Sequence, residues 1–375
     1  MKNIFIIYPG FPHYRNGIIE ELLLSKKFKY TFVGDKNGYA GIKPYNFNGV
    51  ENFIHCPAYK IGPFFFNKGL IRLALKAKAD GIIVHSSPYW VSIILASIIF
   101  RVKGIKVFNW AHGLLSNQQN IHSKLYYYFF KIFFDGLLLY GNQSKNNLVN
   151  MGYNQKKIKV IYNSLDYKKQ IQLRGLLKES ERKEIREKMF IHPEYYQILF
   201  IGRLTSQKKL DLLVNAVKKL KDENIYVNLL FVGEGSEKEF LLDQIEKLKI
   251  NNQVHFYGAS YNESNNYKLI ASSDICVAPG EIGLTAMHSL VYGVPVISHS
   301  DPNEQMPEFE AIQPGINGAL FENGNTYDLK EKIKDVIKLI QIKSKSELQN
   351  NCYQIVDKNY NPEYQLNLIE EIFDT

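Results

Sequence analysis

Short apolar runs alternate along the chain with amphipathic stretches. In the first half, runs typical of buried strands occupy residues 3–8, 29–33, 81–85, 106–110, 136–140 and 157–162. Between them, the spacing of apolar positions predicts helices over residues 17–25, 68–79, 90–101, 124–134 and 143–151. Such alternation predicts an α/β protein with mostly parallel sheets.

The alternation of apolar runs and amphipathic stretches stops near the middle of the chain and then resumes. Residues 168–188 are dense in Lys, Arg, Glu and Gln and have little β character, which predicts a helix leading out of a first domain. Beyond it, we expect strands over residues 196–201, 227–232, 254–257, 275–278 and 295–299. Helices are expected over residues 210–221, 238–248, 263–272, 283–292, 327–342 and 361–373.

The length of 375 residues fits two domains of ordinary size. We predict a Rossmann-like N-terminal domain over residues 1–167, a connecting segment over 168–195 and a second Rossmann-like domain over 196–355. The C-terminal residues 356–375 are expected to form a helix that packs back on the first domain. Two such domains would place a ligand in a cleft at the carboxyl ends of their strands.

Composition narrows the class of protein. The formal net charge of +9 favours a polyanionic partner, such as nucleic acid, anionic lipid or a phosphate-bearing small molecule. Cys56, Cys276 and Cys352 lie far apart without CxxC spacing, which argues against a disulfide framework or zinc site and indicates a reducing compartment. The first apolar run is too short for a signal peptide, and no run reaches the roughly 20 residues of a membrane span. These features predict a cytoplasmic protein.

The segment ILFIGRLTSQKKLDLLVNA, residues 198–216, contains a strand-to-helix turn with two cations. Arg203 and Lys208 come from this one turn, so both side chains can point into a cleft. Arginine offers a rigid fork that suits phosphate, and lysine offers a point charge. By charge alone a solvated basic turn would be the commoner interpretation, but the place after Gly202 at a strand's carboxyl end favours a phosphate site.

A second candidate site lies in APGEIGLTAMHSLVYGVPVI, residues 278–297. Gly283 leaves room for a diphosphate, and the N–H groups of Gly283, Leu284 and Thr285 begin a predicted helix, where anions bind. The Thr285 hydroxyl can add another hydrogen bond. His288 lies one turn on and can donate to ribose or phosphate oxygens, although a histidine in this setting is more often a half-buried structural residue.

The order of these segments resembles the large family of retaining nucleotide-sugar glycosyltransferases with the GT-B fold, which includes many bacterial lipopolysaccharide and capsule enzymes. The shared pieces are GRL with its following Lys and Asp at 202–211, FVGEG at 231–235, VHFYG at 254–258, SSDICVAP at 272–279, GL at 283–284 and YGVPVI at 292–297. In the first half only AHG at 111–113 and VIYNSLD at 160–166 are similar. The resemblance implies two Rossmann-like domains facing a central cleft.

One departure from the family concerns a pair of glutamates around the GL helix start. In the family, the first glutamate holds sugar hydroxyls and the second holds the ribose. Here the second position is His288 and the first is Gly280, with Glu281 as a stand-in if the loop is shorter. The chain resembles a subgroup with GLTAxHSL at this point. The resemblance then implies that Glu281 holds the sugar and His288 the ribose.

The resemblance also suggests roles outside these two segments. His112, in NWAHG, would be the catalytic group that contacts the transferring sugar near its anomeric carbon. Glu308 resembles the glutamate of the family's Pro-Glu pair, with Glu310 as the alternative. The acceptor-side loop matches the family's first glycine loop only loosely. The residues of that loop are His13, Arg15 and Gly17.

The activity implied by the resemblance is transfer of a hexose-type sugar from a nucleotide-diphosphate sugar to a glycan or lipid-linked acceptor. Configuration would be retained, and the reaction would serve surface polysaccharide assembly. No cofactor is implied, and no metal is expected because the chain has no DxD motif. The alternatives are a catalytically impaired nucleotide-sugar-binding protein and a sugar-nucleotide epimerase on the same fold. Nucleic acid is not expected as a partner, because the cations are scattered and no recognition motif is present.

The segment between Tyr59 and Ala79 is basic and contains no acidic residue. Three consecutive phenylalanines, residues 64–66, precede its predicted helix. Cations beside aromatic side chains suit the surface of an anionic membrane, and a solvated surface helix explains them equally well. On the first interpretation the protein would lie peripherally on the inner face of the cytoplasmic membrane. The cations are Lys60, Lys68, Arg72, Lys76 and Lys78.

Overall fold

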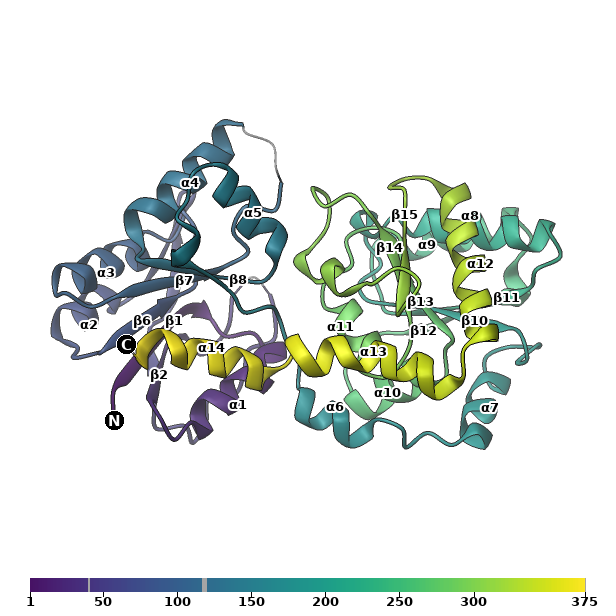
Figure 1. Ribbon diagram of the computed structural model, residues 1–375, viewed down its shortest axis with the longest axis horizontal. Coiled ribbons are helices and arrows are strands. Elements are labelled where there is room, and N and C mark those ends of the chain that lie inside the picture. Colours follow the sequence, from purple (N-terminus) through teal and green to yellow (C-terminus); the bar gives the residue numbers. More distant parts are fainter. Residues whose placement is uncertain (40, 117–119, 375) are drawn as a thin grey trace. The chain divides into compact units, whose positions relative to one another are not determined.

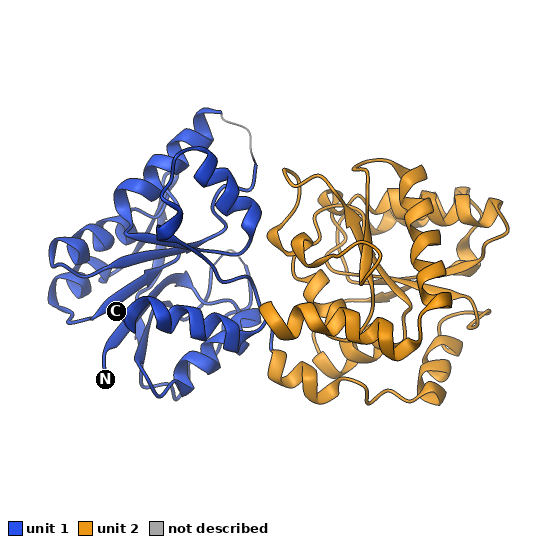
Figure 2. Ribbon diagram, viewed as in Figure 1, with its two compact units in different colours: residues 1–166, 361–375 blue, residues 167–360 orange. Residues whose placement is uncertain are grey.

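The computed structural model describes residues 1–39, 41–116 and 120–374, and the chain forms two compact units (Figure 1; Figure 2). The first unit comprises Met1–Asp166 together with the C-terminal segment from Asn361 onward. The second unit comprises Tyr167–Tyr360. Each unit has a parallel β-sheet covered by helices, which confirms the predicted α/β class with two Rossmann-like domains.

In the described part of the first unit, seven parallel strands form a sheet in the order β3-β2-β1-β6-β7-β8-β9. These strands are β1 (Asn3–Gly10), β2 (Lys29–Asp35), β3 (Phe53–His55), β6 (Gly81–Val84), β7 (Val107–Ala111), β8 (Gly136–Leu139) and β9 (Ile158–Val160). The order reverses at β1, which pairs with β2 on one side and β6 on the other. A crevice therefore opens at the carboxyl ends of β1 and β6.

Helices cover both faces of this sheet. They are α1 (Asn16–Leu24), α2 (Leu70–Lys76), α3 (Val91–Val102), α4 (Ile121–Phe133), α5 (Asn142–Asn150) and α14 (Pro362–Asp374). Because side chains alternate along a strand, Phe5 and Ile7 of β1 join one core with α2, α3 and α4. Ile4 and Ile6 join the other core with α1 and α14.

The second unit has a parallel sheet in the order β12-β11-β10-β13-β14-β15. Its strands are β10 (Tyr196–Ile201), β11 (Val227–Val232), β12 (Val254–Gly258), β13 (Ile275–Ala278), β14 (Val296–His299) and β15 (Gly318–Phe321). Its helices are α6 (Tyr167–Leu173), α7 (Glu179–Glu187), α8 (Leu210–Asp222), α9 (Lys238–Lys247), α10 (Glu263–Ala271), α11 (Thr285–Leu290), α12 (Thr326–Ile342) and α13 (Lys345–Asn359). Here the order reverses at β10, between β11 and β13.

The segment expected to connect the domains is part of the second unit. Residues 168–195 contain two helices, α6 and α7, where the sequence predicted one, and both contact α10. The guanidinium groups of Arg182 and Arg186 both donate to the carboxylate of Asp274, just before β13. Ion pairs therefore hold the segment to its unit. Because such contacts produce no periodic pattern of apolar residues, the sequence did not reveal them.

The basic segment after Cys56 contains a shorter helix than predicted. Its first part is an antiparallel hairpin of β4 (Ala58–Ile61) and β5 (Phe64–Asn67). The helix expected over residues 68–79 is the shorter α2, which follows Gly69 in a left-handed conformation with φ of 84°. Strands β3 and β15 and helix α13 were also not predicted, because their apolar runs are short or interrupted by polar residues.

The C-terminal helix belongs to the first unit. It spans Pro362–Asp374, close to the helix predicted over 361–373, and its first residue suits the first turn of a helix. Residues 356–359, which were assigned to the same C-terminal segment, belong to α13. Figure 1 shows α14 beside α1, and the two helices contact one another. The Ser25 hydroxyl donates to Glu370, and the Lys2 ammonium donates to the carbonyl oxygen of Phe373 at 2.7 Å. The two ends of the chain are thereby joined within one unit.

Candidate functional site

Two loops of the second unit meet where its strand order reverses. One follows β10 and the other follows β13, and the N–H of Gly280 donates to the carbonyl oxygen of Lys208 at 3.0 Å. A Cβ atom at Gly280 would lie 1.9 Å from the carbonyl oxygen of Gln207. The close contact of the two loops therefore requires glycine at the position where the resembling family has its first glutamate.

Lys208 lies at the centre of a group of charges in these loops. Its ammonium donates to the carbonyl oxygen of Glu281 at 2.7 Å and lies 3.6 Å from the Glu281 carboxylate. Burial lowers the pKa of Lys208, Glu281 raises it, and the nearby charges of Arg203 and Glu308 add smaller opposing effects. The structure thus brings together four residues that the sequence predicted as one site.

The two remaining charges of the group differ in exposure. Arg203 is exposed, and its guanidinium makes no ion pair within the part of the chain that the structure describes. The Glu308 side chain is buried, with 1% of its surface exposed, in the 3-10 turn Pro307–Ala311. Glu310 is only half-buried. Glu308, rather than Glu310, is the carboxylate whose charge acts on Lys208.

The turn into α11 offers backbone donors beside this cluster. Gly283 has φ of 54°, a conformation that favours glycine. Among the described residues, the N–H groups of Gly283, Leu284 and Thr285 have no backbone or side-chain acceptor. The Thr285 hydroxyl, expected to face an anion, donates instead to the carbonyl oxygen of Ile201 at 2.9 Å. Thr285 therefore ties α11 to β10 and leaves its N–H for a ligand.

His288 is held by a carboxylate that the sequence did not reveal. Its Nε2 lies 3.0 Å from Oε1 of Glu263, the first residue of α10, which also accepts from Gln170 and Tyr292. Although burial opposes ionisation, the hydrogen bonds from His288, Tyr292 and Gln170 lower the pKa of Glu263 to about 2. Nothing in the local sequence around Glu263 marks it, because its partners come from α6, from α11 and from the turn after α11.

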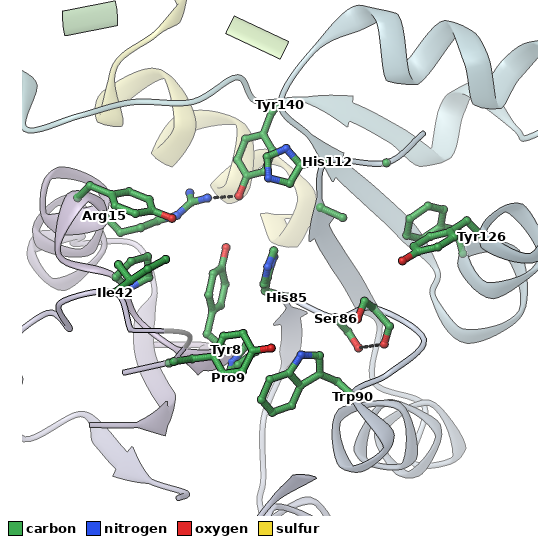
Figure 3. A pocket seen from close by; sticks show the side chains of 18 residues that line it. Tyr8, Pro9, Arg15, Ile42, His85, Ser86, Trp90, His112, Tyr126 and Tyr140 are labelled. Carbon is green, nitrogen blue, oxygen red and sulfur yellow. Dashed lines mark hydrogen bonds between the residues drawn. The ribbon is translucent and has the colours of Figure 1, made fainter. Parts of the chain in front are cut away.

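The first unit has a pocket of about 450 Å³ at the carboxyl ends of its central strands (Figure 3). The loops after β1, β6 and β7 form most of it, where the strand order reverses. Seven of its eighteen lining residues are Tyr, Trp or Phe, and none is Asp, Glu or Lys. The lining residues are Tyr8, Pro9, Gly10, Pro12, Tyr14, Arg15, Tyr39, Ile42, His85, Ser86, Ser87, Trp90, Ala111, His112, Gly113, Tyr126, Phe130 and Tyr140.

His112 lines this pocket, with its ring centroid 4.7 Å from that of Tyr140. Burial, reinforced by His85 and Arg15, lowers the pKa of His112 to about 3. Its Nδ1 is buried and has no hydrogen-bond partner among the described residues. The imidazole is therefore neutral at neutral pH and retains hydrogen-bonding capacity for a ligand.

The three acceptor-side residues have different surroundings. Arg15 lines the pocket and donates to the Tyr140 hydroxyl. His13 is exposed, outside the pocket, and its Nδ1 lies 3.1 Å from the carbonyl oxygen of Lys43. Gly17 is buried in α1, where a Cβ atom would lie 2.4 Å from the carbonyl oxygen of Leu165. Gly17 therefore serves packing, and Arg15 alone of the three faces the pocket.

The described residues have further features that bear on function. No group of three or more His, Cys, Asp or Glu side chains is arranged there to hold a metal ion. None of the described helices combines the length and the apolar character that crossing a bilayer demands. All three cysteines are buried and unpaired with one another. That no metal takes part stays a prediction, which these observations do not test.

Residues 181–355, which lie entirely in the second unit, match the sequence model of the family described as glycosyl transferases group 1. This match supports a glycosyltransferase. An uncharacterized 41.2 kDa protein in the cps region of Klebsiella pneumoniae is 25% identical to this chain over 79% of each chain.

Two solved structures share the fold of this chain. The Anabaena protein Alr3699/HepE in complex with UDP superposes with a TM-score of 0.75, at 16% identity over 100% of both chains. The lipopolysaccharide outer core galactosyltransferase WaaB, in its apo form, superposes with a TM-score of 0.68, at 18% identity over 99% of both chains. The predicted GT-B fold is thereby confirmed.

Proposed function

We propose that this glycosyltransferase moves a hexose-type sugar from a nucleotide-diphosphate sugar to a glycan or lipid-linked acceptor, with retention of configuration. The observation that carries the proposal is the gathering of Arg203, Lys208 and three unpaired N–H groups where the strand order of the second unit reverses. Such a concentration of donors fits a diphosphate. The UDP complex of the Anabaena protein and the cps location of the Klebsiella relative support the donor class and a role in surface polysaccharide assembly.

The leaving diphosphate is the group that most needs stabilisation in this reaction. As the bond between the anomeric carbon and the phosphate oxygen breaks, that oxygen keeps the electron pair, and Arg203 and Lys208 neutralise the developing charge. The sugar passes through an oxocarbenium-like state. The acceptor hydroxyl attacks from the same face and gives its proton to the departing phosphate oxygen, so configuration is retained. Lys208 exchanges its contact with Glu281 for the phosphate when the donor binds.

The carboxylates and histidines divide the remaining roles in this proposal. Glu281 and Glu308 accept hydrogen bonds from sugar hydroxyls, because their carboxylates lie beside Lys208. His288 contacts the ribose through Nδ1, since Nε2 is bonded to Glu263, which fixes the orientation of the ring. His112 contacts the transferring sugar as a neutral hydrogen-bonding group, because its low pKa makes it a poor proton donor at neutral pH.

Transfer to a defined acceptor tests the proposal. Purified protein is incubated with UDP-glucose or other nucleotide sugars and a panel of glycoside acceptors, and the anomeric configuration of the product is measured by NMR. The proposal predicts product with the configuration of the donor. A product with inverted anomeric configuration would contradict the proposed retention. Donor binding without transfer would favour the catalytically impaired alternative that Gly280 suggests. Conversion of the donor without acceptor would indicate an epimerase.

We also propose peripheral contact with an anionic membrane through the first unit. The cations of the basic segment, Lys60, Lys68, Arg72, Lys76 and Lys78, are all exposed. A second feature, absent from the sequence prediction, lies on α4. Its apolar side chains recur every three or four residues, are more than half exposed, and are flanked by the exposed Lys124 and Lys131. These apolar side chains are Ile121, Leu125, Tyr128 and Ile132.

An amphipathic helix with an exposed apolar stripe and flanking cations suits the boundary between lipid headgroups and acyl chains. Sedimentation with vesicles of phosphatidylglycerol and phosphatidylcholine measures this contact against phosphatidylcholine alone. We expect binding to the anionic vesicles, weakened severalfold by salt and by the double change Leu125→Ser and Ile132→Ser. If the double variant bound as well as the unchanged protein, α4 would not be part of the contact. If the unchanged protein did not sediment with the vesicles, the proposed membrane contact would be wrong.

A further inference from the structure

Arg15 is a buried cation that lacks a carboxylate partner. Only 8% of its surface is exposed, and its guanidinium donates to a phenol, that of Tyr140. No Asp or Glu forms an ion pair with its guanidinium among the described residues. Burying a charge without a counter-charge is costly, so a folded protein normally pairs such a group. An unpaired guanidinium at the wall of a pocket therefore points to a counter-charge supplied by a ligand.

Aromatic rings stabilise the guanidinium only in part. Its carbon lies 4.8 Å from the ring centroid of Trp110, 5.0 Å from that of Tyr140 and 5.8 Å from that of Tyr8. Burial raises the pKa of both Tyr8 and Tyr140, so neither phenol is ionised at neutral pH. The rings offer π-electron density and a hydroxyl oxygen, and the net charge of Arg15 remains.

The rest of the pocket wall carries no opposing charge. Its lining residues include no Asp, Glu or Lys, and burial lowers the pKa of His85 to about 4 and that of His112 to about 3. Arg15 is therefore the single formal charge among the residues that line this pocket at neutral pH. Figure 3 shows its guanidinium directed toward Tyr140 and His112, next to the space that the aromatic side chains enclose.

The remaining surfaces of the pocket suit a sugar ring. Trp90 and Tyr126 present aromatic faces or edges, and Ser86 and His112 present hydrogen-bonding atoms. A ligand that satisfies both features has an anionic group beside a ring with hydroxyls. A neutral sugar would leave the guanidinium uncompensated, and a free inorganic anion would leave the aromatic walls uncovered.

The charge of the surrounding chain favours anions as well. Between Asn52 and Leu165 the sequence has 14 Lys and Arg and only two carboxylates, Asp80 and Asp135. Arg101 pairs with Asp135, which leaves a large excess of positive charge around this unit. Such a field raises the local concentration of anionic ligands and the rate at which they bind.

We propose that the acceptor binds in this pocket through an anionic group, a carboxylate or a phosphate next to a sugar ring, and that Arg15 selects it. The proposal rests on the proposed glycosyltransferase function and adds the chemical class of the acceptor. A carboxylate would come from an acidic sugar, and a phosphate from a phosphorylated sugar or the headgroup of a lipid-linked one. Both present the paired oxygens that a guanidinium binds.

Tryptophan fluorescence gives a direct measurement, because the chain has two tryptophans and both adjoin this site. Trp90 lines the pocket and Trp110 lies under the Arg15 guanidinium. The full-length protein is titrated with methyl glucuronide, glucose 6-phosphate and the neutral methyl glucoside. We expect a dissociation constant at least about tenfold lower for one or both charged sugars, as a charge-assisted bidentate contact provides. The charged sugar that binds better identifies the carboxylate or phosphate class.

Two variants test the assignment to Arg15. Arg15→Met removes the charge at similar size. In this variant the dissociation constants of the charged and neutral sugars should become about equal, and that of neutral methyl glucoside should change less than about threefold. Arg15→Lys keeps the charge and should retain part of the preference, which distinguishes loss of charge from loss of fold. Equal fluorescence changes, or none, with charged and neutral sugars in the unchanged protein would overturn the proposal, as would a preference that survives Arg15→Met.

A parallel titration with UDP separates this proposal from the proposed function. UDP binding should be unchanged in Arg15→Met. If UDP competes with the charged sugars and loses affinity in Arg15→Met, the guanidinium belongs to the donor and the acceptor proposal fails. If the charged sugars bind as expected but no nucleotide sugar binds or reacts, the proposed transferase function fails and the pocket assignment stands.

Discussion

The two units of this protein use one topology for two sites of different charge. In each, a crevice forms where the strand order reverses, at β1 in the first unit and at β10 in the second. The second unit places cations and carboxylates together there, with Lys208 held by Glu281. The first unit places one buried cation, Arg15, among aromatic rings. The topology thus sets where a ligand binds, and the loops set which ligand.

The two sites differ in how their cations are stabilised when no ligand is bound. Lys208 has a carboxylate nearby that it can exchange for phosphate, and Arg203 is exposed to solvent, so neither bears a large cost without ligand. Arg15 is buried with only a phenol as hydrogen-bond partner, so its cost is relieved only in part by rings. We therefore expect the second site to tolerate an empty state readily and the first to discriminate strongly by charge.

The largest expected effect comes from removing the exposed cation of the second unit. Arg203→Ala should lower kcat/KM for transfer by about 100- to 1000-fold, as loss of a group that stabilises developing charge does. The melting temperature should change little, because the side chain is exposed. Lys219→Ala, which removes an exposed cation of α8, is the matched control and should keep full activity. Turnover of Arg203→Ala equal to that of the control would remove Arg203 from the mechanism.

A smaller effect is expected from restoring the family glutamate at the loop contact. Gly280→Glu places a side chain against the backbone of Gln207, so the free energy of unfolding should fall by about 1–3 kcal/mol. Chemical denaturation measures it. Glu281→Ala, in the same loop but partly exposed, is the control and should change stability less. Full stability of Gly280→Glu with higher transfer would mean that the loop can open for the family arrangement.

The smallest expected effect is a change in the pH dependence of stability in the first unit. The pKa of His112 is lowered from 6.5 to about 3, so at pH 5 the unfolded chain binds a proton that the folded chain does not. Stability therefore falls as the pH drops from 6.5 toward 3. In His112→Asn, urea unfolding near pH 5 should take up about one proton fewer than in the unchanged protein. An unchanged slope would show that the histidine is solvated and titrates normally.

Much of the fold was predictable because burial leaves a local pattern. The strands over residues 196–201, 227–232 and 275–278 were predicted with the bounds that the structure shows, since each is a continuous apolar run. Arg203 and Lys208 were predicted as neighbours of Gly283 because the loops that carry them follow adjacent parallel strands. Proximity of this kind follows from the order of the strands in the sheet, which the pattern of the sequence predicts.

What the sequence did not reveal depends on contacts between distant segments. Glu263 contacts His288 from another helix, and Arg182 and Arg186 pair with Asp274, which lies 92 and 88 residues away from them in the sequence. The sequence marks Arg15 only as part of a loosely matched acceptor-side loop, and only the folded chain shows it buried beside Trp110. Polar partnerships have no periodicity, so such residues can be found only once the packing is known.

The most direct test of the account is the affinity of UDP for the cations of the second unit. Isothermal titration calorimetry of UDP is performed on the unchanged protein, on Lys208→Met and on the control Lys219→Ala. The account predicts binding to the unchanged protein and the control, and a loss of about tenfold or more in Lys208→Met, because a charge-assisted contact to the diphosphate is removed. Equal affinity for all three proteins would contradict the assignment of this site to the donor diphosphate.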